Sequence, residues 1–137
     1  MKTRIAVLAK PQAPLVLDEV ELPSPAKGQV TVKLFASGIC HSQLHQIHSA
    51  ATRVPQLIGH EATGVVEAVG RGVTHVKEGD YAFVTWLPRA AKPGDARPAS
   101  IVIPWRGQEA SQTVFTWADR TLAPQEYVVK VDRKSVV

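Results

Sequence analysis

The stretch around which the chain is organised is GICHSQLH at residues 38–45, together with GHEATG at residues 59–64. It contains Cys40, the only cysteine of the protein, and the adjacent pair His60 and Glu61. A thiolate, a neutral imidazole and a carboxylate are donor types that zinc accepts in proteins. The stretch therefore predicts a metal site with Cys40, His60 and Glu61 as candidate ligands.

The alternative is that Cys40 is a small buried hydrophobe, as free cysteines often are. Its surroundings favour the metal site, because Cys40 ends a strand-like run and begins a polar segment, where the pKa of a thiol can be lowered. Gly59 stands directly before His60, and Gly64 and Gly70 follow. These glycines indicate backbone that turns or is closely approached where the imidazole is presented.

Alternating apolar and polar residues occur in short segments bounded by proline or glycine, which predicts a mainly β fold. The predicted strands are residues 3–9, 15–22, 30–36, 60–69, 81–86, 101–105, 114–122 and 127–131. Residues 41–49 lack glycine and proline, and Leu44 and Ile47 lie three apart, so one or two helical turns are expected there. Residues 53–57 and most of residues 88–111 are expected to form loops.

Composition narrows the class of protein. The 137 residues suffice for one domain, with 45% hydrophobic and 20% charged residues. The net charge of +4 is scattered along the chain, so nucleic-acid binding is not expected. No apolar run approaches the roughly 18 residues of a membrane span, and no signal peptide is recognisable. A single cysteine is typical of a reducing compartment, which predicts a cytoplasmic protein without membrane contact.

The motifs GICHS at residues 38–42 and GHExxGxxxxxG at residues 59–70 resemble those of the zinc-dependent alcohol dehydrogenases of the medium-chain dehydrogenase/reductase family. The similarity is to their N-terminal GroES-like catalytic domain and extends over about residues 1–132. The resemblance implies a partly open β-barrel with short helices over residues 1–137. It also implies Zn2+, an alcohol or aldehyde substrate, and NAD or NADP bound by a nucleotide-binding domain that these residues do not include.

The resemblance further implies roles for individual residues. Ser42 would accept the alcohol proton and His45 would pass it to solvent, while His41 would contact the cofactor pyrophosphate. Trp86 would form a wall of the substrate pocket, and Glu61 would either bind the metal or act beside its ligands. The alternatives are that His41 and His45 are ordinary exposed polar residues and that Trp86 is a core aromatic.

Two departures from the family pattern concern the metal. Gln43 stands where the family commonly has an aspartate that orients the zinc-bound histidine; its amide oxygen is expected to accept the imidazole N–H without contributing charge. Residues 88–111 contain no cysteine where the family often has a four-cysteine zinc lobe. The resemblance implies a second cysteine ligand for the catalytic zinc, which would lie beyond residue 137, so Cys40, His60 and Glu61 would form an incomplete set.

The leading hypothesis is therefore the catalytic domain of a zinc-dependent alcohol dehydrogenase, which is expected to be inactive alone because no glycine-rich dinucleotide fingerprint is present. A non-catalytic GroES-like module that binds partners or assembles is the alternative. A metal-free relative of the quinone reductases is disfavoured by Cys40 and His60. A homo-oligomer is expected, because apolar surface normally covered by the nucleotide-binding domain, and the apolar end Val136 and Val137, would be exposed.

Overall fold

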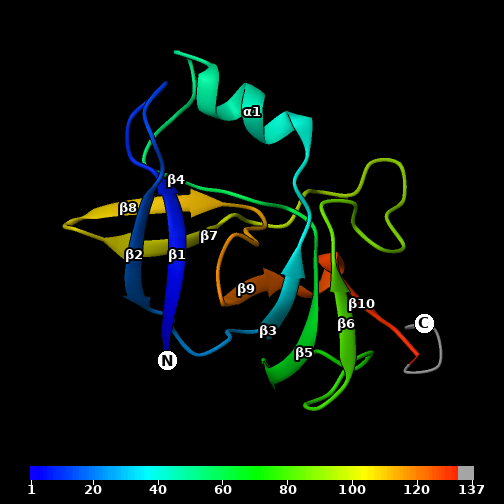
Figure 1. The fold of residues 1–137 in the computed structure, drawn as a ribbon. Coiled ribbons are helices and arrows are strands. Elements are labelled where there is room, and N and C mark those ends of the chain that lie inside the picture. Colours follow the sequence, from blue (N-terminus) through cyan, green and yellow to red (C-terminus); the bar gives the residue numbers. More distant parts are fainter. Residues whose placement is uncertain (133–137) are drawn as a thin grey trace.

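The computed structural model describes residues 1–132. Val136 and Val137, which were predicted to take part in self-association, lie outside the described residues. The described chain is built from short strands with one α-helix and one 3-10 helix (Figure 1). In chain order the elements are β1 (Lys2–Leu8), β2 (Val16–Glu21), β3 (Gln29–Ser37), α1 (His41–His48), β4 (Gln56–Leu57), β5 (Ala62–Val69), β6 (Tyr81–Val84), β7 (Ile101–Trp105), β8 (Gln108–Gln112), β9 (Arg120–Pro124), η1 (Gln125–Tyr127) and β10 (Val128–Lys130). The prediction of a mainly β fold with short helices is confirmed.

The strands form two curled sheets of five strands each. The first sheet has the order β2-β1-β4-β8-β7, and the second has the order β10-β6-β5-β3-β9. Pairing is antiparallel except between β4 and β8, which are parallel. The pair β3 and β5 forms the centre of the second sheet, and these two strands lead to Cys40 and away from His60 respectively.

Each sheet has its own apolar cluster. The cluster of the first sheet includes Ile5, Val7, Leu57, Ile103 and Phe115, all at most 2% exposed. The cluster of the second sheet is dominated by valines, namely Val30, Val32, Val66, Val76, Val84, Val114 and Val128. Full burial of one such aliphatic side chain contributes about 1.5 to 3 kcal/mol, so these clusters are the main source of stability.

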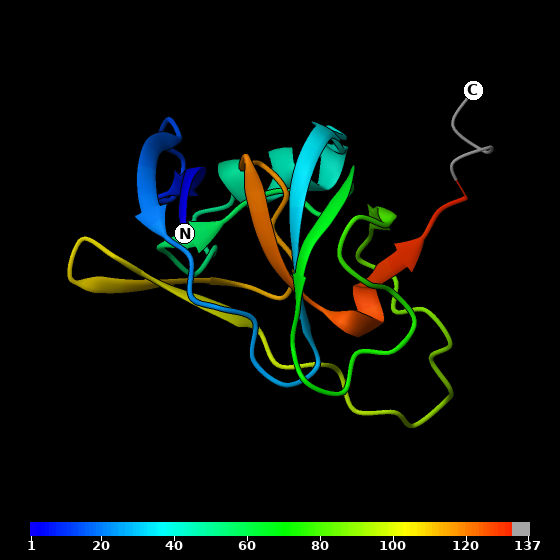
Figure 2. The same ribbon diagram turned by 90° about the horizontal axis from the view of Figure 1, so that it is seen from below.

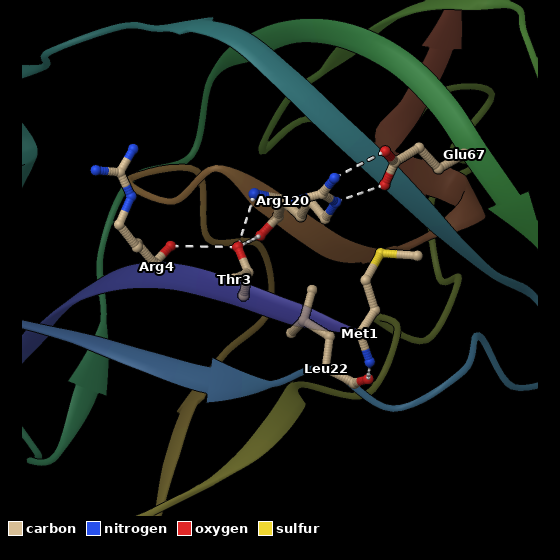
Figure 3. Close-up of polar contacts among 6 residues, drawn as sticks. All are labelled: Met1, Thr3, Arg4, Leu22, Glu67 and Arg120. Atoms are coloured by element: carbon tan, nitrogen blue, oxygen red, sulfur yellow. Dashed lines mark hydrogen bonds and ion pairs between the residues drawn. The ribbon is translucent and has the colours of Figure 1, made fainter.

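A polar junction ties the two sheets together at the start of the chain (Figure 3). The buried hydroxyl of Thr3 on β1 accepts the backbone N–H of Arg120 on β9 at 2.9 Å. The Arg120 guanidinium then donates to both carboxylate oxygens of Glu67 on β5, at 2.7 and 3.2 Å. This hydrogen-bonded pairing raises the pKa of Arg120. The junction therefore links three strands from both sheets.

Most predicted strands agree with the structure, and β7 has the predicted bounds. The prediction of one strand over residues 114–122 is wrong, because β9 begins only at Arg120. Residues 113–119, here called the crossing segment, instead run between the sheets and bond to Ile58 and to β1. The predicted loops at residues 53–57 and 88–111 contain β4 and the start of β8, which form backbone ladders that alternation did not reveal.

The β7 and β8 hairpin and the long loop between β6 and β7 project on opposite sides of the molecule (Figure 2). Within residues 1–132, no helix combines the length and apolar character needed to cross a membrane. The long loop begins just after β6 at Thr85 and carries Trp86. It is therefore the loop that brings the predicted pocket aromatic to the end of the second sheet.

Gly64 is expected to be indispensable to the contact between β3 and β5. A Cβ at Gly64 would lie 2.2 Å from the Lys33 carbonyl oxygen and 2.8 Å from Val32 Cγ1, so Gly64→Ala must push the strands apart. We expect a loss of more than about 2 kcal/mol in the free energy of unfolding, measured with urea.

The control is Gly79→Ala, where φ is 85° but no atom lies within 4 Å of the new Cβ. It should cost roughly 1 kcal/mol from backbone strain alone. Equal losses in the two variants would contradict the close approach.

Candidate functional site

Cys40 lies at the junction between β3 and α1, where the chain changes from strand to helix. It is the residue that caps α1, with extended backbone angles of φ −115° and ψ 148°. The side-chain oxygen of Gln43 accepts the Cys40 backbone N–H at 2.6 Å. This is the reciprocal arrangement of a capping box, in which the third helical residue reaches back to the cap. The cap thus fixes the backbone that carries the thiol.

His60 is positioned by the glycine before it. Gly59 has φ 93°, and a Cβ there would lie 2.5 Å from Thr116 Oγ1 and 2.6 Å from the Trp117 backbone nitrogen. The backbone N–H groups of Thr116 and Trp117 both donate to the Ile58 carbonyl, at 3.1 and 3.0 Å. Only glycine fits this left-handed and crowded position. The crossing segment therefore sets the place where the imidazole leaves the backbone.

A second set of hydrogen bonds joins the two backbone segments next to the candidate ligands Cys40 and His60. The Glu61 carbonyl oxygen accepts the Gly38 backbone N–H at 2.9 Å and the Ser37 hydroxyl at 3.0 Å. The Thr116 hydroxyl lies 2.9 Å from the Ser37 hydroxyl and 3.3 Å from the same carbonyl. Sequence reasoning missed Ser37 and Thr116 as supports of the site. No local sequence pattern marks these two residues, because Ser37 and Thr116 contact each other from positions 79 residues apart in the chain.

A cleft of about 780 Å³ brings several predicted site residues together. Cys40, Ser42, His60 and Trp86 all line it. The Trp86 ring lies 6.3 Å from the His60 ring, measured between centroids, and the two planes are inclined by 67°. Trp86 is 54% exposed, so the alternative of a core aromatic is wrong. The indole instead lies at the cleft, beside the candidate ligand.

The other predicted site residues, His41, His45 and Glu61, are not part of the cleft lining. His41 and His45 are exposed on α1, with ring centroids 4.8 Å apart in an edge-to-face contact. Glu61 is half-buried, and its carboxylate packs close to Gly38 rather than lining the cleft. Ser42 and His45 are one helical turn apart, so they share a side of α1.

Gln43 contacts both candidate ligands, Cys40 and His60. Its side chain is 1% exposed, and its amide nitrogen lies 3.3 Å from His60 Nδ1. The expectation that the amide oxygen would accept the imidazole N–H is wrong, because the amide nitrogen faces the ring while the oxygen accepts the Cys40 backbone N–H. The ring therefore meets the nitrogen end of the amide.

Hydrogen bonds also act on the thiol of Cys40. Those from the side chain and backbone of Ser42, with a smaller one from the backbone of His41, lower the pKa of Cys40 below its usual range. Partial burial and the Glu61 carboxylate oppose this change. A thiol with a lowered pKa supplies the thiolate that binds metals and reacts with electrophiles.

Cys40 and His60 have the donor chemistry of a zinc site and face one cleft, so the two residues fit such a site in part. Over residues 1–132, no three or more His, Cys, Asp or Glu side chains are grouped so as to hold a metal ion. Catalytic zinc takes three protein ligands and one open position. Cys40 and His60 would accordingly supply two of these three ligands.

Comparison with known proteins places this geometry in context. Residues 26–133 match the family described as "Alcohol dehydrogenase GroES-like domain". The NDMA-dependent alcohol dehydrogenase of Amycolatopsis methanolica is 45% identical over 89 residues, covering 64% of this chain and 24% of the relative. The alcohol dehydrogenase of Geobacillus stearothermophilus is 36% identical over 133 residues, covering 93% of this chain and 40% of the relative. The chain thus spans less than half of the length of these curated relatives.

Solved structures agree on the fold. A crystal structure described as an alcohol dehydrogenase zinc-binding domain protein from Burkholderia ambifaria aligns with a TM-score of 0.77 at 22% identity. The alignment covers 100% of this chain and 44% of that protein. Identity at this level establishes the shared fold alone.

We expect the lowered pKa of Cys40 to be measurable as alkylation at a lower pH than for an ordinary thiol. Iodoacetamide reacts with the thiolate, so the reaction rate follows deprotonation. Ser42→Ala removes the largest lowering contact and should move the midpoint of the rate profile to higher pH. Ser42→Thr keeps a hydroxyl and serves as the control that restores the lower midpoint. An unchanged midpoint in Ser42→Ala would contradict the assignment.

Proposed function

Because the chain belongs to the alcohol dehydrogenase GroES-like domain family, we propose that it supplies the substrate-binding and metal-binding part of an alcohol dehydrogenase. The proposed reaction is oxidation of an alcohol, or reduction of an aldehyde, with NAD or NADP as the hydride carrier. The observation that carries the proposal is the common cleft shared by Cys40, Ser42 and His60. In this cleft two side chains with metal-binding donor atoms and a hydroxyl lie next to space for a small molecule.

Cys40 Sγ and a ring nitrogen of His60 would hold a zinc ion in this proposal. When bound, zinc acts as a Lewis acid that lowers the pKa of an alcohol. Glu61 would act beside the ligands, since its carboxylate influences the Cys40 thiol but does not line the cleft. Ser42 would act on both the metal ligand and the substrate, because it hydrogen-bonds to Cys40 and also lines the cleft.

Proton movement would begin at Ser42 Oγ, the hydroxyl that lines the cleft. It would accept the alcohol proton, and His45, one turn further along α1 and exposed, would deliver it to solvent. His41 would contact the cofactor pyrophosphate, since it is the exposed first residue of α1 and helix N-termini favour anions. The ring contact between His41 and His45 would orient both side chains.

Trp86 would limit the size of the substrate. Its indole lies beside His60 and contributes apolar surface to the cleft. Aromatic side chains provide large rigid contact surfaces at binding sites. Substrates that pack against a flat apolar wall are therefore favoured over highly branched ones.

A non-catalytic GroES-like binding module is the second candidate function. The observation that favours it is that, in the described part of the chain, Cys40 and His60 have no third ligand grouped with them. Direct metal titration separates the two candidates, because only the dehydrogenase proposal requires the pair to bind a metal.

We expect Cys40→Ser and His60→Ala each to weaken binding of Co2+, used as a spectroscopic substitute for zinc, by at least roughly 10-fold. Each variant removes one of the two donors that face the cleft. The measurement is a titration followed by the visible and thiolate charge-transfer absorption of cobalt. His48→Ala is the matched control, because His48 is an exposed histidine at the other end of α1. Equal affinity in all four proteins would contradict the assignment of Cys40 and His60.

A further inference from the structure

The amide of Gln43 contacts two partners, the backbone nitrogen of Cys40 and the imidazole of His60. Its oxygen lies 2.6 Å from the backbone nitrogen of Cys40. A backbone N–H is a donor only, so the amide atom that meets it must be the oxygen. The amide nitrogen, which is a donor only, therefore faces His60 Nδ1 at 3.3 Å.

This arrangement dictates which ring nitrogen of His60 carries the proton. A donor at Nδ1 requires Nδ1 to be the acceptor, and a neutral imidazole then carries its proton on Nε2. Gln43 is 1% exposed, so no water replaces the amide at this contact. We propose that Gln43 is a positioning residue that holds neutral His60 in the Nε2-protonated tautomer, so that the ring offers the cleft an N–H instead of a metal-binding lone pair.

The inference deepens the proposed function, because it concerns the affinity of the same centre for a metal. Metal binding through Nε2 needs the proton on Nδ1, and Nδ1–H would then point at the amide NH2 of Gln43. Turning the amide around would satisfy His60 but would place NH2 against the Cys40 backbone N–H. A carboxylate has two oxygens that can accept both N–H groups at once. Either way, metal binding through Nε2 would cost one of the two hydrogen bonds that the Gln43 amide makes.

The first test uses the wild-type protein without metal and requires no substitution. Long-range 1H–15N correlation spectra distinguish protonated from unprotonated ring nitrogens, and His60→Ala identifies the His60 signals among the five histidines. We expect Nδ1 unprotonated and Nε2 protonated in wild type. Gln43→Glu, which has the same shape, should reverse the two. A wild-type ring protonated on Nδ1 would overturn the proposal.

The second test measures zinc affinity by competition with a chromophoric chelator. Gln43→Glu should bind zinc at least roughly 10-fold more tightly than wild type, the size typical of contacts that orient a ligand. Gln46→Glu is the matched control, because Gln46 also lies on α1 and lines the cleft, so it adds the same charge there. It should change affinity by less than about 3-fold, since a partly exposed charge is screened by solvent.

The two tests separate the inference from the function on which it rests. A gain in Gln43→Glu no larger than that in Gln46→Glu would overturn the proposed effect on metal affinity. If none of the three proteins bound zinc, the proposed function would be contradicted, while the metal-free spectra would still decide the tautomer. A reversed tautomer together with a selective gain in Gln43→Glu would support both parts.

Discussion

The close approach of Gly59 to the crossing segment is the constraint on which the site depends. Three atoms of Thr116 and Trp117 lie 2.5 to 2.7 Å from the place where a Cβ would stand. The same segment bonds to β1 of the first sheet, through Ala6 N–H to the Trp117 carbonyl at 2.9 Å and Asp119 N–H to the Arg4 carbonyl at 3.1 Å. The His60 backbone is therefore held from the first sheet, while Cys40 extends from a strand of the second. The cleft is a product of how the two sheets meet.

The hydrophobic clusters and the polar contacts play different parts in bringing the two sheets together. Apolar burial scales with area and is indifferent to direction, so the valines of the second sheet stabilise it without fixing its orientation. The junction of Thr3, Arg120 and Glu67 is directional, and the Arg120 and Glu67 side chains are only 26% and 22% exposed. Partly buried ion pairs add little net stability but disfavour alternative arrangements in which a charge is left unpaired. The junction therefore serves mainly to align β1 with β5 and β9.

Much of this could be predicted from the sequence, and the limits have physical causes. Alternation identified β3 and β5, because one face of each packs on a core. The strand prediction failed at residues 114–122. There Val114, Phe115 and Thr116 are buried as in a strand, but the backbone bonds of the segment go to Ile58 and β1. Local motifs and the family resemblance singled out Cys40, His60 and Trp86, which line one cleft in the structure. The orientation of Gln43 did not, because it depends on a competition between a helix cap and an imidazole that is 17 positions away.

That competition has a structural reason in the length of α1. An isolated helix of eight residues is well below the roughly 12 to 15 residues at which helices become marginally stable in water, so α1 relies on its ends. Gln12 bonds the last turn through the Ile47 and His48 carbonyls, each at 2.9 Å. At the other end, the Gln43 oxygen accepts the Cys40 N–H and completes the cap. The residue that stabilises the start of the helix is thus the residue that contacts the candidate ligand. One amide has one acceptor oxygen, so the requirement of the cap determines what the imidazole can do.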